Sequence, residues 1–184
     1  MTLISAKVIN VNSDAQIAAA TLAVALLGAA AATASPVLPR SAIVELSTVQ
    51  KYFPQVAREQ YSGMNKTAAA NPVATRSVIF VSADGSKKVT LSVDRYASGG
   101  DALSAFHIAV AKSKIPGFAP ISIPVIGQSS FAGRVTRGNE THVGLGAVDG
   151  NLVVGATLAG YAATDANVQH LISLARLEDA QAKR

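Results

Sequence analysis

The sequence contains no cysteine and no tryptophan in its 184 residues. The absence of cysteine excludes disulfides, thiolate metal sites, cysteine nucleophiles and CxxC redox chemistry. Aromatic residues make up only 5% of the chain, and the basic residues behind its net charge of +5 are scattered. A nucleic-acid-binding protein would cluster its cations and supply aromatic rings for stacking, so we expect no nucleic-acid partner. The basic residues are interpreted as a solvated surface, with weak contact to anionic envelope polymers or lipids as the alternative.

The N-terminal segment is uncharged over a long stretch. Residues 17–32 are apolar or small throughout and end at an A-x-A pattern, Ala32–Ala34, which Ser35 and Pro36 follow. This length is typical of the hydrophobic region of a signal peptide and is shorter than the ~20 residues of a membrane-spanning helix. The sequence therefore predicts a signal peptide over residues 1–34 and a periplasmic or secreted protein. An uncleaved N-terminal membrane anchor and a buried alanine-rich core helix remain as alternatives.

After the signal peptide, the pattern predicts a flexible lead-in over residues 35–46 and then a single domain over residues 47–184. Prolines interrupt the lead-in, and Ser47 is a candidate N-cap for a helix that would run to about Gln60. The stretch from Met64 to Pro72 has no hydrophobic period and is interpreted as a loop.

The middle of the chain has the pattern of a β-hairpin followed by a helix. Val73 to Ser82 is rich in β-branched residues, and Asp84-Gly85 is a turn signal. Lys88 to Tyr96 alternates, with Val89, Leu91 and Val93 on one side, which predicts a half-buried strand. Asp101 is the expected cap of a helix over 102–112.

The last third predicts further strands and a final helix. The expected strands are a short piece over 120–125 and three longer segments over 127–137, 141–148 and 152–158, with a turn at Asp149-Gly150-Asn151. Thr164 or Asp165 is expected to cap a helix that ends near Arg176. The charged residues after Arg176 are expected to fray. This order predicts an α+β fold, in which about five to six strands form a twisted antiparallel sheet with helices on one face.

No arrangement of residues specifies a chemical reaction. His107, His142 and His170 lack metal-ligand spacing, and the Gly127–Phe131 stretch places its serines outside a G-x-S-x-G motif. The sequence therefore assigns no catalytic, cofactor-binding or metal-ligating residue, and we expect no cofactor.

The layout from Ser47 onward resembles small exported bacterial domains of the α/β sandwich type. The features are the helix–hairpin–helix start, the Gly127–Arg134 stretch before a strand, and the closing strand Asn151–Ala156 before an Ala/Leu helix. Such domains occur in the PsbP and Mog1 proteins and as the extracellular sensor domain of PknH-like mycobacterial kinases. The kinase domains carry disulfides, which this chain lacks. The resemblance implies a non-enzymatic envelope module that binds a ligand or partner in a groove.

Three functions follow as hypotheses. The first is an exported, non-catalytic module that binds a small ligand or an envelope protein. The second is a structural or assembly factor of the cell envelope, which a large apolar patch or an unpaired sheet edge would favour. The third is an envelope hydrolase, which would need His142 or His170 within reach of a serine. None of the three specifies an oligomeric state.

Overall fold

The computed structural model describes residues 37–61, 71–113, 115–138 and 140–184. The predicted signal peptide, its cleavage site and most of the predicted loop over 64–72 lie outside the described residues. None of the helices in the described ranges is both long enough and apolar enough to cross a membrane.

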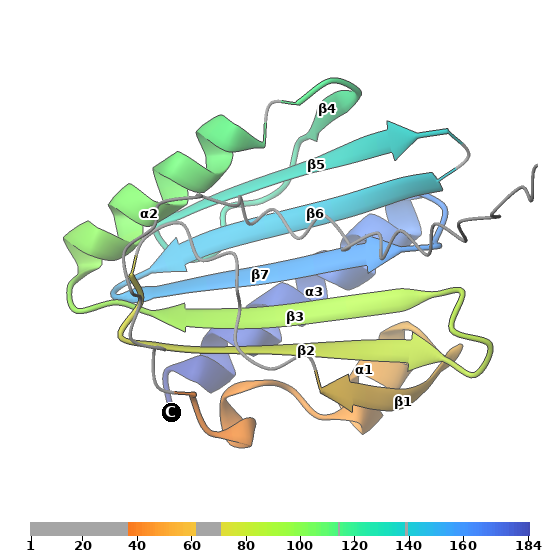
Figure 1. Ribbon diagram of the computed structural model, residues 1–184, viewed down its shortest axis with the longest axis horizontal. Helices are drawn as coiled ribbons and strands as arrows, with labels where there is room; N and C mark the ends of the chain where they lie inside the picture. Colours follow the sequence, from red (N-terminus) through yellow and green to blue (C-terminus); the bar gives the residue numbers. More distant parts are fainter. Residues whose placement is uncertain (1–36, 62–70, 114, 139) are drawn as a thin grey trace, which may run out of the picture.

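The centre of the fold is one antiparallel sheet (Figure 1). Its seven strands follow the order β1-β2-β3-β7-β6-β5-β4. The turns at Gly85 and Gly150 join hairpin partners, and both glycines have positive φ, 74° and 58°, which is a conformation that glycine adopts without strain. The strands are β1 (Val56–Tyr61), β2 (Ala74–Ser82), β3 (Lys88–Arg95), β4 (Phe118–Ile121), β5 (Ser129–Arg137), β6 (Glu140–Asp149) and β7 (Leu152–Ala159).

Helices cover both faces of this sheet. On the first face, which we call the core face, α1 (Leu46–Tyr52) and α3 (Asp165–Ala182) pack behind the strands in Figure 1. On the second face, α2 (Gly99–Lys112) packs through Phe106 against Val148 of β6, near one end of the sheet. The largest side chains buried in the core are Phe53, Phe80, Ile43, Leu91, Leu145, Leu158, Leu171 and Ile172.

The predicted α+β class and antiparallel sheet are confirmed, and two details differ. The helix predicted from Ser47 to Gln60 is shorter, because α1 begins after Glu45 and ends at Tyr52. Pro54 lacks the backbone N–H that a continuing helix needs, and the chain turns into β1. This strand brings the count to seven instead of five or six. The second difference is α2, which lies on the face opposite to α1 and α3.

The other strand and cap predictions hold with small corrections. Ser98, not Asp101, is the N-cap of α2, where its hydroxyl accepts from the Asp101 N–H at 3.1 Å. Thr164 caps α3 as expected. The predicted half-buried strand β3 is buried on both faces. On this strand, Ser92 packs closely against Gly155 of β7. A Cβ on residue 155 would come within 2.6 Å of the Ser92 hydroxyl oxygen.

The described part of the predicted lead-in is not loose. Leu38, Ala42, Ile43 and Val44 are buried in the main core. Leu38 also donates its backbone N–H to the Thr75 carbonyl of β2 at 3.0 Å. The segment forms a short 3-10 helix, η1 (Arg40–Ala42), directly after Pro39, and its apolar residues pack on the core face.

Candidate functional site: a cleft at the end of helix α3

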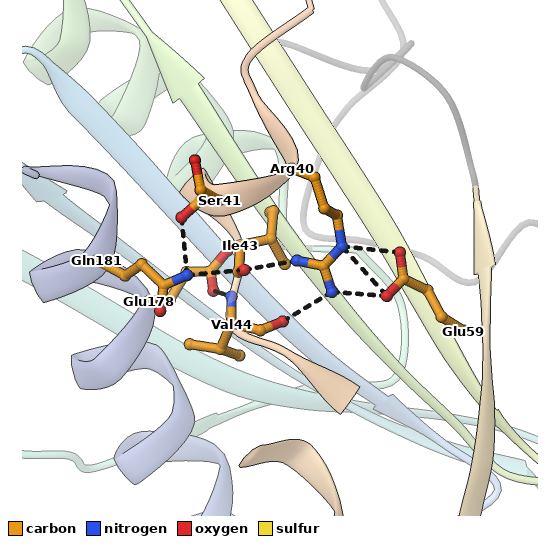
Figure 2. Close-up of polar contacts among 7 residues, drawn as sticks. All are labelled: Arg40, Ser41, Ile43, Val44, Glu59, Glu178 and Gln181. Atoms are coloured by element: carbon orange, nitrogen blue, oxygen red, sulfur yellow. Dashed lines mark hydrogen bonds and ion pairs between the residues drawn. The ribbon is translucent and has the colours of Figure 1, made fainter. Parts of the chain in front are cut away.

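The last turns of α3 are ordered, although the sequence predicted fraying after Arg176. The helix continues to Ala182, and Glu178 is 0% exposed. These turns pack against residues 37–44, and Figure 2 shows the labelled residues of that segment beside the helix. Two segments from opposite ends of the described chain therefore meet here.

Side chains of α3 hold this N-terminal segment through its backbone. The Glu178 carboxyl accepts from the Val44 N–H at 3.0 Å. Gln181 donates from its side-chain amide to the carbonyls of Ser41 and Ile43, at 2.7 and 2.9 Å (Figure 2). No strand within the described ranges pairs with these backbone groups, and the helix side chains satisfy them instead.

Arg40 completes the same network from the other side. Its guanidinium donates to the Ile43 carbonyl at 2.6 Å and to the Val44 carbonyl at 3.1 Å. It also forms a bidentate ion pair with Glu59 of β1, with contacts of 2.9 and 2.6 Å (Figure 2). Most donors of this arginine are taken by its neighbours, so it serves the fold.

Burial changes the ionisation of Glu178. Loss of solvation raises the pKa of this carboxyl from 4.5 to about 8, while the Val44 N–H and the Arg40 charge act in the opposite direction. The second carboxyl oxygen, Oε1, has no hydrogen-bond partner among the described residues. At neutral pH the group is therefore mostly protonated, which avoids a buried charge.

Two adjoining hollows open beside this network, and together we call them the Arg95 cleft. The larger lobe measures about 410 Å³ and is lined by Pro39, Ser41, Ala42, Arg95, Gln181, Ala182 and Arg184. The smaller lobe measures about 350 Å³ and is lined by Arg95, Asp149, Gly150, Asn151, Leu152, Ala182 and Lys183. Arg95 and Ala182 belong to both lobes. The cleft therefore joins the segment around Pro39, the end of α3, the end of β3 and the β6–β7 turn.

Arg95 occupies the shared wall of the cleft. It ends β3 and follows Val89, Leu91 and Val93 in strand alternation, so its side chain leaves the sheet on the core face. It is half-buried, and its Nη2 donates to the Ala182 carbonyl at 3.3 Å. None of the ion pairs found within the described ranges includes Arg95.

The smaller lobe is electrostatically balanced. Lys183 forms ion pairs with Asp149, on the β6–β7 turn, and with Asp179 of its own helix. Hydrogen bonds to the two carboxylates, first to Asp149 and then to Asp179, raise the pKa of Lys183. Lys183 is shared between these two carboxylates, and the charges of Lys183 and Arg95 together balance those of Asp149 and Asp179.

The three histidines do not come together. His170 of α3 lies on the core face against the rings of Tyr52 and Phe53, at 5.7 and 5.8 Å. His142 alternates with the core residue Val143 on β6 and so leaves the sheet on the other face. His107 is exposed on α2. No group of three or more potential metal-ligating side chains occurs in the described part of the chain.

The serine stretch also lies away from His142. Ser130 is paired with Ala147, five residues along β6 from His142, which is roughly 17 Å at strand spacing. The two side chains also leave the sheet on opposite faces. The Ser130 hydroxyl instead accepts from the Ile126 N–H at 3.1 Å. The geometry therefore gives no support to a Ser130–His142 pair. His170 is the other histidine of the hydrolase hypothesis, and its Nδ1 atom is buried without a hydrogen-bond partner among the described residues.

Arg95 and Glu178 were not predicted as site residues, although both continue periodic patterns of the sequence. Arg95 occupies the next core-facing position of an alternating strand, where an apolar residue is expected. Glu178 extends the buried helical series of Leu171, Leu174 and Ala175 by one turn. A charged residue in phase with an apolar pattern was the available signal for both.

Comparison with known proteins identifies a similar fold. No protein-family model matches this sequence, and no curated protein matches it. Among solved structures, the chain is similar to the extracellular domain of PknH from Mycobacterium tuberculosis. The TM-score is 0.54 at 12% identity, over 76% of this chain and 94% of that domain. The expected likeness to the kinase sensor domains is thus confirmed for the fold, and the likeness to PsbP and Mog1 remains a prediction.

Proposed function

We propose that this protein is a non-catalytic binding module outside the cytoplasm and that its ligand binds in the Arg95 cleft. The observation that carries the proposal is the cleft itself, because a half-buried arginine without an acidic partner in the described residues separates its two lobes. Each lobe falls within the ~300–1,000 Å³ typical of small-molecule sites. Arg95 gives such a site its polar anchor.

The location outside the cytoplasm is supported by two independent observations. Residues 1–34 have the pattern of a signal peptide with an A-x-A cleavage site. The similar PknH structure is an extracellular domain, and the likeness extends over most of both chains. Cleavage near Ala34-Ser35 leaves the described domain and its cleft intact.

A structural or assembly role is less well supported. The end strands of the sheet carry features that oppose pairing with another chain. The edge strand β1 exposes Arg58 and Glu59, and the opposite edge strand β4 is short and contains Pro120. Assembly through a sheet edge would therefore place Arg58 and Glu59, or Pro120, at the new strand–strand interface.

Two measurements test the proposal. The intact mass of the protein from the extracytoplasmic fraction of its host should correspond to a chain that begins within a few residues of Ser35. Two-dimensional amide NMR of that mature protein with small-molecule extracts of the envelope should shift signals of Arg95, Asn151 and Ala182. Full-length protein in the cytosol would contradict the location, and shifts confined to α2 or the sheet edges would contradict the site.

A further inference from the structure

We propose that the larger lobe of the Arg95 cleft receives a compact oxyanion group, a phosphate or carboxylate of a small ligand, which the Arg95 guanidinium binds. This inference rests on the proposed binding function and specifies the chemistry of its ligand.

Two arginines at the same end of α3 differ in how their donors are used. Arg40 is committed to the fold, because Glu59 and two backbone carbonyls accept from it. Arg95 donates one hydrogen bond to a neutral carbonyl within the described residues, at 3.3 Å. A guanidinium has five N–H donors in a fork that matches carboxylate and phosphate oxygens. Arg95 therefore retains most of its donors for a ligand, whereas most donors of Arg40 are already used.

The side chains that line the larger lobe are positively charged. They include two arginines, Arg95 and Arg184, and no acidic residue. The nearby carboxyl of Glu178 is mostly protonated at neutral pH, because burial raises its pKa to about 8. The acidic residue of the neighbouring lobe, Asp149, is paired with Lys183. The charge of the lining side chains therefore favours an anion in the larger lobe.

The remaining walls of the larger lobe fit a small ligand better than a bare ion. Pro39, Ala42 and Ala182 line one part of the lobe and offer apolar surface to a short carbon skeleton. Ser41 lines the lobe with its carbonyl already bonded to Gln181, which leaves its hydroxyl as a polar contact. The Gln181 amide spans the segment from Ser41 to Ile43 and so holds this wall in place before any ligand binds.

The test uses the mature protein with inorganic phosphate and with succinate as probes, followed by amide NMR titration at low and moderate salt. We expect saturable shifts at Arg95 and Ala182 that weaken as salt increases. Arg95→Gln should weaken binding roughly 10- to 100-fold, because a charged hydrogen-bond donor is lost. Arg95→Lys should bind with intermediate affinity, since it keeps the charge without the fork.

Arg176→Gln is the matched control. It removes the same charge from the exposed side of α3, outside the cleft lining, and should leave the affinity unchanged. If Arg95→Gln fails to fold, Arg95→Lys and Arg184→Gln still test the inference, and Arg184→Gln should weaken binding by a smaller factor. Binding of phosphate and succinate that is equal in wild type and Arg95→Lys, or absent in wild type, would overturn it.

The source of the anion is tested with glycerol phosphate and with phosphatidylglycerol vesicles, using phosphatidylcholine vesicles as reference. Arg95-dependent binding of free glycerol phosphate supports the inference. Arg95-dependent binding to phosphatidylglycerol vesicles without binding of any free anion contradicts it and indicates a membrane surface instead. If neutral envelope compounds shift the cleft signals and anions do not, the anion inference fails while the proposed function stands.

Discussion

The Glu178 carboxyl accepts a hydrogen bond from the Val44 backbone N–H, 134 residues earlier in the chain, at 3.0 Å. This contact joins the final turns of α3 to the segment that precedes α1. The carboxyl is fully buried, and its other oxygen has no partner among the described residues. A structural contact is thus made by a group whose ionisation falls near neutral pH.

We predict that stability decreases as the pH rises from about 4.5 towards 8. The pKa of Glu178 is about 8 in the folded state, against an ordinary value of 4.5. Its contribution to stability is therefore complete below pH 4.5 and is lost as the pH rises through the folded pKa. The full loss is of the order of 5 kcal/mol, at about 1.4 kcal/mol per pKa unit. Urea unfolding at several pH values measures it. Hydrogen bonds from Ser82 and Ser86 lower the pKa of Asp84 to about 2, so Asp84 affects the stability only at lower pH.

Glu178→Gln is the matched variant for this pH dependence. The amide oxygen still accepts from Val44, and the group does not ionise. We expect the variant to be less stable than wild type at pH 5, because its amide N–H groups lack a partner, and to lose the decline above pH 5. An equal slope in wild type and variant would show that another group causes the pH dependence.

Arg40→Lys should loosen the segment around Val44. Lysine keeps the charge but not the fork that binds Glu59 and the two carbonyls at once, so we expect a loss of about 1–3 kcal/mol. Hydrogen exchange of the amides from Ala42 to Val44 should quicken, with the central β6 and β7 amides unchanged. Arg58→Lys is the control, since Arg58 is exposed and contacts only the Ala83 carbonyl at 3.5 Å in the described part. Equal effects of the two variants would contradict a specific role for Arg40.

The sequence predicted the parts of this fold that depend on local signals. The hairpin turns at Gly85 and Gly150, the cap at Thr164 and the antiparallel strands follow from residue type and periodicity, and the structure contains them. Strand β1 was missed, because VAREQY has the polarity of a helix surface and its strand state depends on pairing with β2.

The site depends on long-range packing that a local pattern does not encode. The charged end of α3 was expected to fray, because Glu178, Asp179 and Lys183 suit solvent. They are instead covered or paired once residues 37–44 and the β6–β7 turn lie beside them. Arg95 was one of several scattered basic residues in the sequence. Its phase with the apolar residues of β3 sets it apart from Arg176 in the sequence, but only the fold places it between two lobes of a cleft.

Gly160→Ala should be far more destabilising than Gly85→Ala. Both glycines have φ of 74°, so both variants have the same backbone strain of about 1–2 kcal/mol. A Cβ at Gly160 would come within 2.1 Å of the Ser86 carbonyl oxygen, whereas at Gly85 nothing lies within 4 Å. The difference between the melting temperatures of the two variants measures the cost of the steric clash at residue 160. Equal melting temperatures would mean that the connection between β7 and α3 moves freely away from the β2–β3 turn.

Asp149→Asn should strengthen the binding of phosphate and succinate. Asp149 is the one acidic side chain among the described residues that line the Arg95 cleft, and it neutralises Lys183. Its removal makes both lobes more positive, which at solvent-screened separations is worth about a two- to fivefold gain in affinity. The gain should disappear at high salt. Asp165→Asn, at the far end of α3, is the control and should leave the affinity unchanged, because its charge is remote from the cleft. Weaker anion binding in Asp149→Asn would mean that the Lys183 ion pair orders the site rather than lowers its charge.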